Sequence, residues 1–502
     1  MEETKHAQAK MLSGLTFSVF FLLFHSPISS ATSPPSPPIV CIVGGGISGS
    51  SVAHFLRRYS PHTALTLRIF ERSGVVGGRM ATVVLAGETF EAGASILHPK
   101  NFHAVNFTKM LNLSVKTPPS SESSLSLGIW DGEKFVFKTL DSNSKSSIVQ
   151  RIVAITNSVL LFVRYGFSLL KMDSFVQTTV DNFLKYYASF ESRPVFETVD
   201  EMLKWADLYN LTARTLQDEL VEAGLSPLLI EELVTVITRI NYGQSVSISG
   251  LAGAVSLAGS GGGLWSVERG NWQIVAGLIN HSDVVLHRHE EIESVSYHGE
   301  YYELNSTKGN SYKCEVAVIA TPLDELNIHF NPPISIPKRK LQHTHATFVR
   351  GLLNPAYFGL VAVSEIPELV GTLEDPNLPF SSISVLRKHD EKDMSYKIFS
   401  RKPMADVLLD RIFSLRKETI RINWGAYPHY SAPEVFAPFV LDGRHLYYVN
   451  AFENAASTME TSAVAAENIA RLILSRYSGL MLSSPSNLKS PGSDEEDLHS
   501  DL

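Results

Sequence analysis

The chain has 502 residues and a formal net charge of -8, from 43 Lys and Arg against 51 Asp and Glu. This length exceeds that of one ordinary core and predicts two domains. The acidic balance argues against a nucleic-acid-binding protein, which needs a basic face. Two cysteines, Cys41 and Cys314, exclude a disulfide-dense scaffold and a cysteine-rich metal site. We interpret both as buried free thiols, with a bridge between them as the alternative.

The two ends of the chain have their own composition. Residues 11–24 are apolar and uncharged, with basic residues before them and small residues after them, which predicts a secretory signal peptide over residues 1–31. A retained N-terminal anchor is the alternative. A proline-rich spacer follows at 32–38, and the acidic end, 478–502, is predicted to be a disordered tail. The secretory route makes five sequons candidate glycosylation sites: Asn106, Asn112, Asn210, Asn280 and Asn305.

A dinucleotide-binding pattern opens the region after the spacer. Residues 39–43 are apolar and β-branched, as in a buried parallel strand, and a helical pattern covers 50–59. Between them lie the three glycines of a G-x-G-x-x-G motif, which allow the tight turn, the approach of a pyrophosphate and close helix packing. These are Gly44, Gly46 and Gly49. A second strand ends in Glu71, where a ribose is bound and where a 2′-phosphate would be repelled, so NADP is not expected.

The next residues distinguish FAD from NAD. Arg72 is followed by a second glycine pair and an arginine, Gly77-Gly78-Arg79, which can bring further amides and a cation to the same diphosphate. This stretch resembles the GG motif of the two-domain flavoproteins that include amine oxidases and phytoene desaturases. The segment from Gly93 to Ser95 resembles the loop that runs under the flavin ring in that class.

Later segments complete the expected cofactor domain. The strand that contains Val285 resembles the one whose valine contacts the adenine in that class. A buried strand over 315–320, which leads to Thr321, resembles the strand of the class that ends near the flavin phosphates. A final helix is expected over about 458–474. Its first turn, including Glu460, is predicted to offer amides to the cofactor, and a plain closing helix is the alternative.

The middle of the chain, about 145–245, is predicted to be helical. A capping box stands at 198–201, Ser226-Pro227 starts a further helix and Gly224 ends the one before it. The apolar segment 148–170 keeps helical spacing, and its arginines argue against a transmembrane helix. We expect it to face the core; a cap over an apolar tunnel, or a surface helix dipping into a membrane interface, remains open.

The fold class that follows is α/β: a Rossmann-like FAD-binding domain of the GG-motif, amine oxidase-like type, interleaved with a largely helical substrate domain. The cofactor domain is assigned to 39–110, 276–335 and 431–477. The substrate domain is assigned to 111–275 and 336–430.

The chain from about Ile39 to Tyr477 resembles the prenylcysteine oxidases, and within them the plant farnesylcysteine lyases. The resemblance rests on the glycine motifs above and on two more particular stretches, 263–271 and 447–460. Their sequences are Gly-Leu-Trp-Ser-Val-Glu-Arg-Gly-Asn and Tyr-Tyr-Val-Asn-Ala-Phe-Glu-Asn-Ala-Ala-Ser-Thr-Met-Glu. Arg269 is a departure, because the family is expected to have glycine there.

The resemblance implies an FAD-dependent thioether oxidase acting on S-farnesylcysteine, and on S-geranylgeranylcysteine. Such an enzyme uses O2 and water and releases the prenyl aldehyde, cysteine and H2O2 during breakdown of prenylated proteins. It also implies a lysosome or vacuole on the secretory route. No cysteine follows Cys314, so FAD is expected to be non-covalent. Neither a metal nor an obligate protein partner is indicated, and peripheral membrane contact is a further expectation.

No catalytic side chain is singled out, because the flavin carries this chemistry. His98, Trp424 and Tyr427 are weak candidates near the substrate, and Tyr430 belongs to the same aromatic segment. The alternatives for function are an amine or polyamine oxidase on the same scaffold, which would favour an acidic channel, and a non-catalytic secreted flavoprotein or lipid carrier.

Overall fold

The computed structural model describes residues 37–61, 65–116, 126–141, 146–324 and 326–477. From Pro38 onward these residues belong to one compact unit. The predicted signal peptide, most of the spacer and the acidic tail lie outside the described residues.

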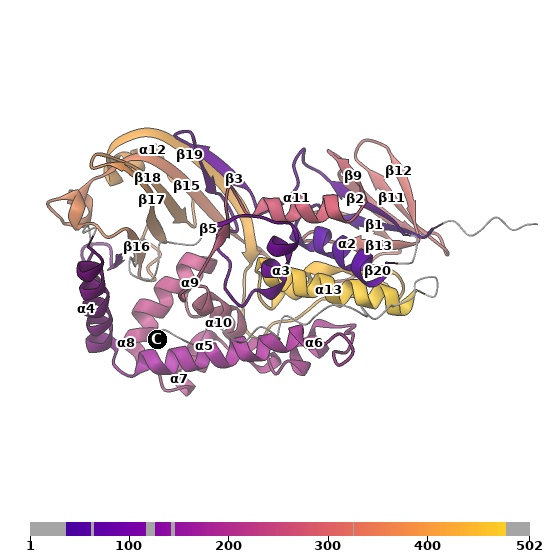
Figure 1. Cartoon of the computed structure of the whole chain (residues 1–502), viewed down its shortest axis with the longest axis horizontal. Helices are drawn as coiled ribbons and strands as arrows, with labels where there is room; N and C mark the ends of the chain where they lie inside the picture. The colour runs from indigo at the N-terminus through magenta and orange to yellow at the C-terminus, as the bar shows by residue number, and fades with distance from the viewer. Residues whose placement is uncertain (1–36, 62–64, 117–125, 142–145, 325, 478–502) are drawn as a thin grey trace, which may run out of the picture. The chain divides into compact units, whose positions relative to one another are not determined.

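A five-stranded parallel sheet forms the first part of the fold (Figure 1). The run of β-branched residues at Ile39–Val43 is the central strand β1, which is buried on both faces as its composition predicts. The order is β20-β13-β1-β2-β9, with every neighbouring pair parallel. The other strands are β2 (Thr66–Glu71), β9 (Val284–Arg288), β13 (Val316–Ile319) and β20 (Leu446–Tyr448). The helices beside it are α2 (Ile47–Tyr59), α3 (Phe102–Met110), α11 (Trp272–His281) and α13 (Met459–Arg476).

Smaller sheets surround this layer. One has the order β12-β11-β10-β14 and shares the main core with the parallel sheet. Its strands are β10 (Ile292–Tyr297), β11 (Tyr302–Ser306), β12 (Ser311–Cys314) and β14 (His329–Asn331). Two-stranded pairs are formed by β3 (Thr82–Leu85) with β4 (Glu88–Glu91), and by β5 (Val115–Lys116) with β8 (Ser266–Val267).

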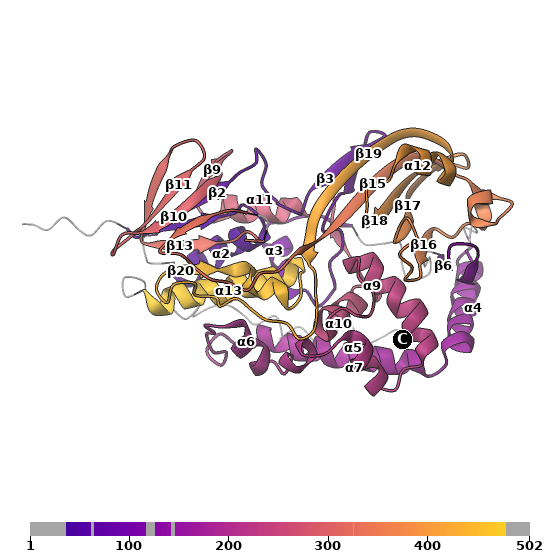
Figure 2. The ribbon, with the colours of Figure 1, turned by 180° about the vertical axis from the view of Figure 1, so that it is seen from behind.

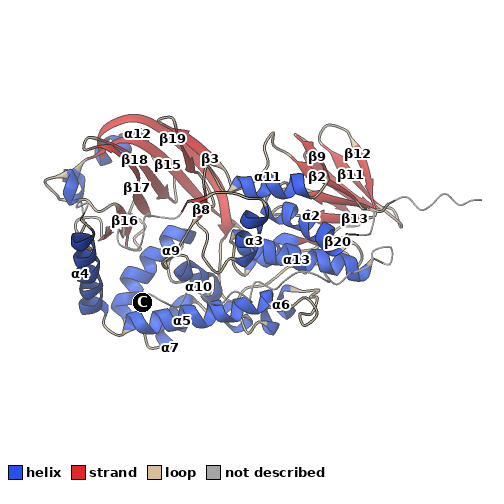
Figure 3. Ribbon diagram, viewed as in Figure 1, coloured by secondary structure: helices blue, strands red, loops and turns tan. Residues whose placement is uncertain are grey.

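The second part of the fold contains a seven-stranded sheet in the order β19-β15-β18-β17-β16-β6-β7 (Figure 3). Its strands are β6 (Leu127–Trp130), β7 (Phe135–Lys138), β15 (Leu341–Leu353), β16 (Leu369–Thr372), β17 (Ser382–Asp390), β18 (Asp393–Ser400) and β19 (Phe413–Pro428). The α/β fold class is confirmed, but a largely helical substrate domain is wrong for 341–428. Charged residues interrupt β17 and β19, so their pairing is not visible in a local pattern.

The helical region predicted over about 145–245 is confirmed by the helices between Ser147 and Tyr242, and one more helix follows it. The capping box is present, since the Thr198 side chain accepts the amide of Glu201, and Ser226 caps the turn that begins at Pro227. The α-helices are α4 (Ser147–Tyr165), α5 (Ser168–Leu184), α6 (Val199–Trp205), α7 (Leu216–Glu222), α8 (Pro227–Leu229), α9 (Thr235–Tyr242), α10 (Gly250–Ala258) and, later, α12 (Asp406–Ile412). A π-helical segment at Ile230–Val234 and short 3-10 turns at Lys185–Tyr187, Tyr209–Thr212, Pro355–Phe358, Val363–Glu365 and Val449–Asn454 complete the helical set.

Helix α4 does not face the core, and that expectation is wrong. Its apolar stripe is exposed, with 71% of Ile148, 58% of Ile152 and 77% of Val163 accessible to solvent. By length and composition alone, the segment Ile148–Tyr165 of this helix is long and apolar enough to cross a membrane. The physical reason for its orientation is that Asn157 and Arg164, together with Leu161 and Tyr165, hold its other face to the protein.

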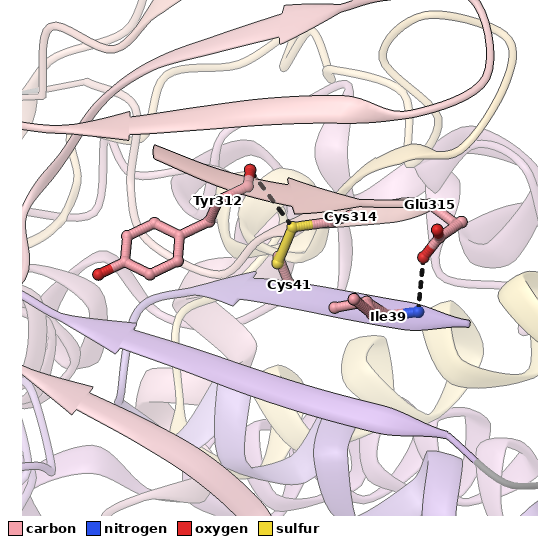
Figure 4. Close-up of a disulfide and its surroundings, with 5 residues drawn as sticks. All are labelled: Ile39, Cys41, Tyr312, Cys314 and Glu315. Atoms are coloured by element: carbon pink, nitrogen blue, oxygen red, sulfur yellow. Dashed lines mark hydrogen bonds between the residues drawn. A yellow bond between two sulfur atoms is a disulfide. The ribbon is translucent and has the colours of Figure 1, made fainter. Parts of the chain in front are cut away.

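The two cysteines are joined in a disulfide, so the interpretation as free thiols is wrong (Figure 4). Cys41 lies in β1 and Cys314 at the end of β12, and their Cα atoms are 5.9 Å apart. They are 273 residues apart in the sequence. The parallel pairing of β1 with β13, which follows Cys314 closely, brings them together.

Removing this bridge should destabilise the protein, because it closes a very long loop. Cys41→Ala with Cys314→Ala is expected to lower the free energy of unfolding by about 2–4 kcal/mol. Denaturant unfolding of wild type and variant measures this difference. A reducing agent should lower the stability of the wild type and leave the variant unchanged; equal stability of all forms would contradict the prediction.

Candidate functional site

The turn between β1 and α2 is shaped by its glycines. Gly44 has a φ of +118°, and a Cβ there would lie 2.5 Å from the carbonyl oxygen of Ala320. A Cβ on Gly49 would lie 2.1 Å from the carbonyl oxygen of Gly44, so helix and turn pack as closely as the motif predicts. Gly46 is the N-cap of α2, and a Cβ there would meet only Gly77 O, at 4.0 Å. The open side of this turn is therefore at Gly46, next to the positive end of the helix.

Glu71, at the end of β2, is buried and fixes the surrounding loops. Its carboxylate accepts the backbone amide of Gly45 at 2.9 Å and that of Ser73 at 2.8 Å. The acid therefore lies at the glycine turn, where the ribose of a dinucleotide would reach it.

The second glycine pair closes on the first. The amide of Gly77 donates to Gly45 O at 2.9 Å, and both Gly77 and Gly78 have positive φ. Arg79 has a partner that the sequence did not indicate: its Nη1 lies 2.5 Å from the buried Glu453 carboxylate. Burial opposes the charge on Arg79, but Glu453 more than offsets this and the pKa of Arg79 is raised.

These elements surround a cavity of about 670 Å³. The predicted residues on its lining are Gly44, Gly46, Glu71, Arg72, Gly77, Gly78, Arg79, Gly93, Thr321, Trp424 and Tyr427. The first turn of α13 contributes Thr458, Met459 and Ser462. Glycine turns that exclude a Cβ, a helix N-terminus and a buried acid are what an extended dinucleotide requires, so these residues fit FAD.

A second cavity of about 570 Å³ adjoins the first. The two have a common wall, formed by Gly93, Ala94, Phe399, Tyr427, Ser457, Thr458 and Met459. Apolar side chains from several elements line the second cavity, among them Phe183, Leu184, Leu251, Val255, Leu386 and Met459. This space can take an apolar molecule, and the common wall is where such a molecule would meet a bound flavin.

Charged residues also line this cavity, and two of opposite sign, Lys397 and Glu91, belong to neighbouring strands and loops beside Ser95. Lys397, on β18, is buried, and its ammonium donates to Glu91 O at 3.1 Å and to Ser95 Oγ at 3.2 Å. Burial lowers the pKa of Lys397 to about 8, against the influence of Glu91. Burial raises the pKa of Glu91 to about 7, although the amide of Asn271 donates to one carboxylate oxygen at 2.6 Å. The other oxygen is buried and has no hydrogen-bond partner among the described residues.

The sequence analysis missed Lys397 and Glu453. Lys397 lies in a strand that pairs with β15 and β17, far along the chain from Ser95. The one signal that could have found it is a lysine inside an otherwise half-apolar strand, Asp393–Ser400. The sequence also contains a signal for Glu453, because an acid within an apolar, buried segment needs a cationic partner.

The candidates near the substrate separate into two groups. His98 lines the apolar cavity, and burial and Lys100 lower its pKa. Tyr427 lies on the wall common to both cavities, and Trp424 lines the cofactor cavity while donating to Ala92 O at 3.2 Å. Tyr430 lines neither cavity; it is buried and donates to Glu453 O at 3.2 Å.

Four predicted cofactor residues do not line the cofactor cavity: Gly49, Ser95, Val285 and Glu460. Gly49 packs against Gly44, and Ser95 lines the apolar cavity. Val285 is half exposed on the edge strand β9 and does not line the cofactor cavity, which is instead reached by Ile292 at the start of β10. The Glu460 carboxylate accepts the amides of His103 and Ala104 at the start of α3, at 2.7 and 3.0 Å. It therefore caps a helix, as acids near helix N-termini do. Its carboxylate is not part of the cofactor cavity.

Arg269, which departs from the family's glycine, has a φ of +67°, a conformation that favours glycine, and it lines the apolar cavity.

The five candidate glycosylation sites differ in exposure. Asn112, Asn210 and Asn280 are exposed, whereas Asn106 and Asn305 are half-buried.

The chain has the fold of the two-domain flavoproteins, with two adjoining cavities. Cyclohexylamine oxidase from Brevibacterium oxydans has this fold, with a TM-score of 0.57 and 16% identity over 87% of this chain and 98% of that chain. Residues 42–111 match the NAD(P)-binding Rossmann-like domain, and residues 148–484 match the prenylcysteine lyase family. The chain belongs to the prenylcysteine lyase family.

Two curated relatives extend over nearly the whole chain. The farnesylcysteine lyase of Arabidopsis thaliana is 66% identical over 93% of this chain and 93% of its own length. Prenylcysteine oxidase 1 of Homo sapiens is 33% identical over 88% of this chain and 90% of its own length. The similarity therefore includes both the cofactor and the substrate parts of the fold.

Proposed function

We propose that this protein is an FAD-dependent thioether oxidase that cleaves S-farnesylcysteine and S-geranylgeranylcysteine. One prenylcysteine, one O2 and one water give the prenyl aldehyde, free cysteine and one H2O2. The observation that carries the proposal is the 66% identity to a farnesylcysteine lyase over 93% of the chain. An apolar cavity that meets the cofactor cavity at a common wall supports it.

The cavity walls account for binding of the prenyl tail. FAD, when bound, supplies a two-electron acceptor for the carbon–hydrogen bond next to sulfur. Phe183, Leu251 and Leu386 offer apolar surface to the tail, and each buried methylene contributes about 0.8 kcal/mol. The wall formed by Gly93, Ala94 and Tyr427 brings the reacting carbon beside the cofactor cavity, so that position, and not a side-chain base, promotes the reaction.

The cysteine end of the substrate is a zwitterion and needs both charges matched. Lys397 and Glu91 are opposite charges on the lining of the apolar cavity, and the Lys397 ammonium bonds to the backbone of Glu91. An ammonium has three donors, and the bonds to Glu91 O and Ser95 Oγ use two of them, which leaves one for the substrate carboxylate. The unpartnered oxygen of Glu91 supplies the acceptor for the substrate ammonium after a small side-chain rotation.

The disulfide supports two further parts of the proposal. The chain has two cysteines, and they are bonded to each other, so neither is available for a thioether link to FAD. We infer that FAD is held non-covalently. A structural disulfide is typical of an oxidising compartment, which favours the secretory route and a lysosome or vacuole.

Peroxide release tests the proposal against its alternatives. S-farnesylcysteine is expected to yield peroxide and, without oxygen, to bleach the flavin; spermine and a simple monoamine are expected to do neither. S-geranylgeranylcysteine should also react. Bleaching by an amine alone would overturn the thioether assignment, and a bound flavin that no substrate reduces would favour a carrier.

A further inference from the structure

Helix α4 presents its apolar residues outward along its whole length. Ile148, Ile152, Ile155, Val159 and Phe162 recur at helical spacing, and between 46% and 71% of each is exposed. The face continues into α5 through Phe167, whose ring lies 5.4 Å from that of Phe162. Monomeric soluble proteins rarely leave so continuous an apolar face in water. Figures 1 and 2 place α4 at the margin of the described fold from both sides.

Polar side chains on the opposite face hold this helix to the protein. Asn157 is buried, accepting the amide of Leu140 at 2.7 Å and donating to its carbonyl at 3.0 Å. Arg164 donates two bonds to Glu232, at 2.7 and 2.6 Å. The Tyr165 hydroxyl donates to the same carboxylate at 2.9 Å. The orientation is therefore fixed by specific bonds, and it is the reverse of an ordinary surface helix.

These bonds also exclude a role as a membrane span. A spanning helix would have to withdraw Arg164 and Asn157 from their partners and expose them to hydrocarbon, at a cost of several kcal/mol for each group. The helix as it is docked can instead lie parallel to a surface. Its anchored polar face would stay on the protein while the apolar face enters an interface.

The charges near this face indicate what that surface is. Residues 147–172 contain no acid, in a chain whose net charge is -8, and their cations are Arg151, Lys171 and Arg164, of which Arg164 is paired with Glu232 on the opposite face. Arg151 and Lys171 are exposed. Cations beside a large apolar face match anionic lipid headgroups above acyl chains. A second copy of this chain would bring the same cations into the contact, which disfavours a symmetric dimer through this face.

We propose that α4 and the start of α5 form a membrane-docking surface that lies in the headgroup region of an anionic lipid bilayer. The inference concerns a different face from the cofactor cavities, and it does not depend on the proposed function. It explains an exposed apolar helix that the reaction itself does not use.

Vesicle binding without substrate tests this surface directly. The purified protein is expected to float with vesicles of phosphatidylcholine and phosphatidylserine, and less with phosphatidylcholine alone. Val163→Glu should weaken this binding about tenfold, because burying a valine side chain is worth about 1.5 kcal/mol or more. Val407→Glu is the matched control, since Val407 on α12 is also 77% exposed, and it should bind as the wild type does.

The charge contribution is tested separately. Arg151→Gln is expected to weaken binding to the anionic vesicles about fivefold and to leave binding to neutral vesicles unchanged. Equal binding by Val163→Glu and Val407→Glu would overturn the proposal, as would a dimer in solution that Val163→Glu dissociates. Peroxide release in detergent should be the same in both glutamate variants, which separates failure of this inference from failure of the proposed function.

Discussion

Replacement of Gly46 by valine is expected to give a folded protein that purifies without flavin. Gly46 has φ -91° and ψ -169°, an extended conformation that valine adopts readily. A Cβ there meets no atom nearer than Gly77 O at 4.0 Å, so the protein itself accepts the side chain. The added methyl groups point instead into the cofactor cavity, where the diphosphate has to approach the amides of α2.

The expected loss is large because these amides bond to a charged group. A hydrogen bond to a charged partner contributes about 1.5–3 kcal/mol, and losing two of them weakens FAD binding about 100-fold or more. Titration of the flavin-free protein with FAD, followed by flavin fluorescence, measures this change. The thermal midpoints of flavin-free wild type and variant should agree, which shows that the fold is intact.

Substitutions at two other glycines serve as controls for the effect of Gly46→Val on FAD binding. Gly262→Val is the matched control, because Gly262 has no atom within 4 Å of a Cβ and lines neither cavity. It should bind FAD as the wild type does. Gly49→Val should fail to fold, since its Cβ would lie 2.1 Å from Gly44 O. Stoichiometric FAD in Gly46→Val would show that the cavity at this turn is not the diphosphate site.

Lys397→Met is expected to raise the KM for S-farnesylcysteine about 10–100-fold at neutral pH. The reason is the loss of a charge-assisted bond to the substrate carboxylate, worth about 1.5–3 kcal/mol. Methionine matches the length of the buried stem, so the cavity keeps its shape. Steady-state peroxide release measures KM and kcat separately, and the increase should appear mainly in KM. Lys392→Met is the control, because Lys392 is exposed in the turn between β17 and β18.

The pH dependence of KM distinguishes binding from packing. Lys397 loses its proton at about pH 8, so the KM of the wild type should rise above that pH, whereas the KM of Lys397→Met should lack this rise. A rise that persists in the variant would assign it to another group and contradict the role of Lys397.

The free energy of unfolding should also depend on pH through Lys397: deprotonation of Lys397 weakens substrate binding but stabilises the fold. The pKa of Lys397 is lower in the folded protein than the ordinary value of 10.5, so the unfolded chain binds more protons between about pH 8 and 10.5. The contribution of Lys397 to stability therefore rises with pH across this window. Below pH 8 its buried charge is a cost, and Lys397→Met should be at least as stable as the wild type. Denaturant unfolding at pH 7 checks this, and a marked loss of stability would indicate a structural role instead.

Local patterns predicted the glycine turn between β1 and α2 and two of the helix starts. The turn from β1 to α2 favours glycine at Gly44 because of its positive φ, and at Gly49 because of the close approach of Gly44 O, and both reasons act within a few residues. The helix starts at Thr198 and Ser226 depend on side chains that bond to amides three residues ahead. Such short-range constraints are visible in the sequence because both partners are neighbours in the chain.

The sequence by itself determined the α/β class, the glycine turn with its acid, and the resemblance to the prenylcysteine oxidases. The tertiary structure alone decided the bond between Cys41 and Cys314, the partner of Arg79, the place of Lys397 and the outward face of α4. Each of these depends on at least one contact between residues far apart in the chain, which strand pairing or helix docking brings together: Cys41 and Cys314 are 273 positions apart, and Arg164 and Glu232 are 68 positions apart. Periodicity shows that a helix has an apolar face, but it does not show which face is buried. That depends on the partners that the folded chain places beside the helix. Beside α4 these partners are Leu140 and Glu232, which form hydrogen bonds with its polar side.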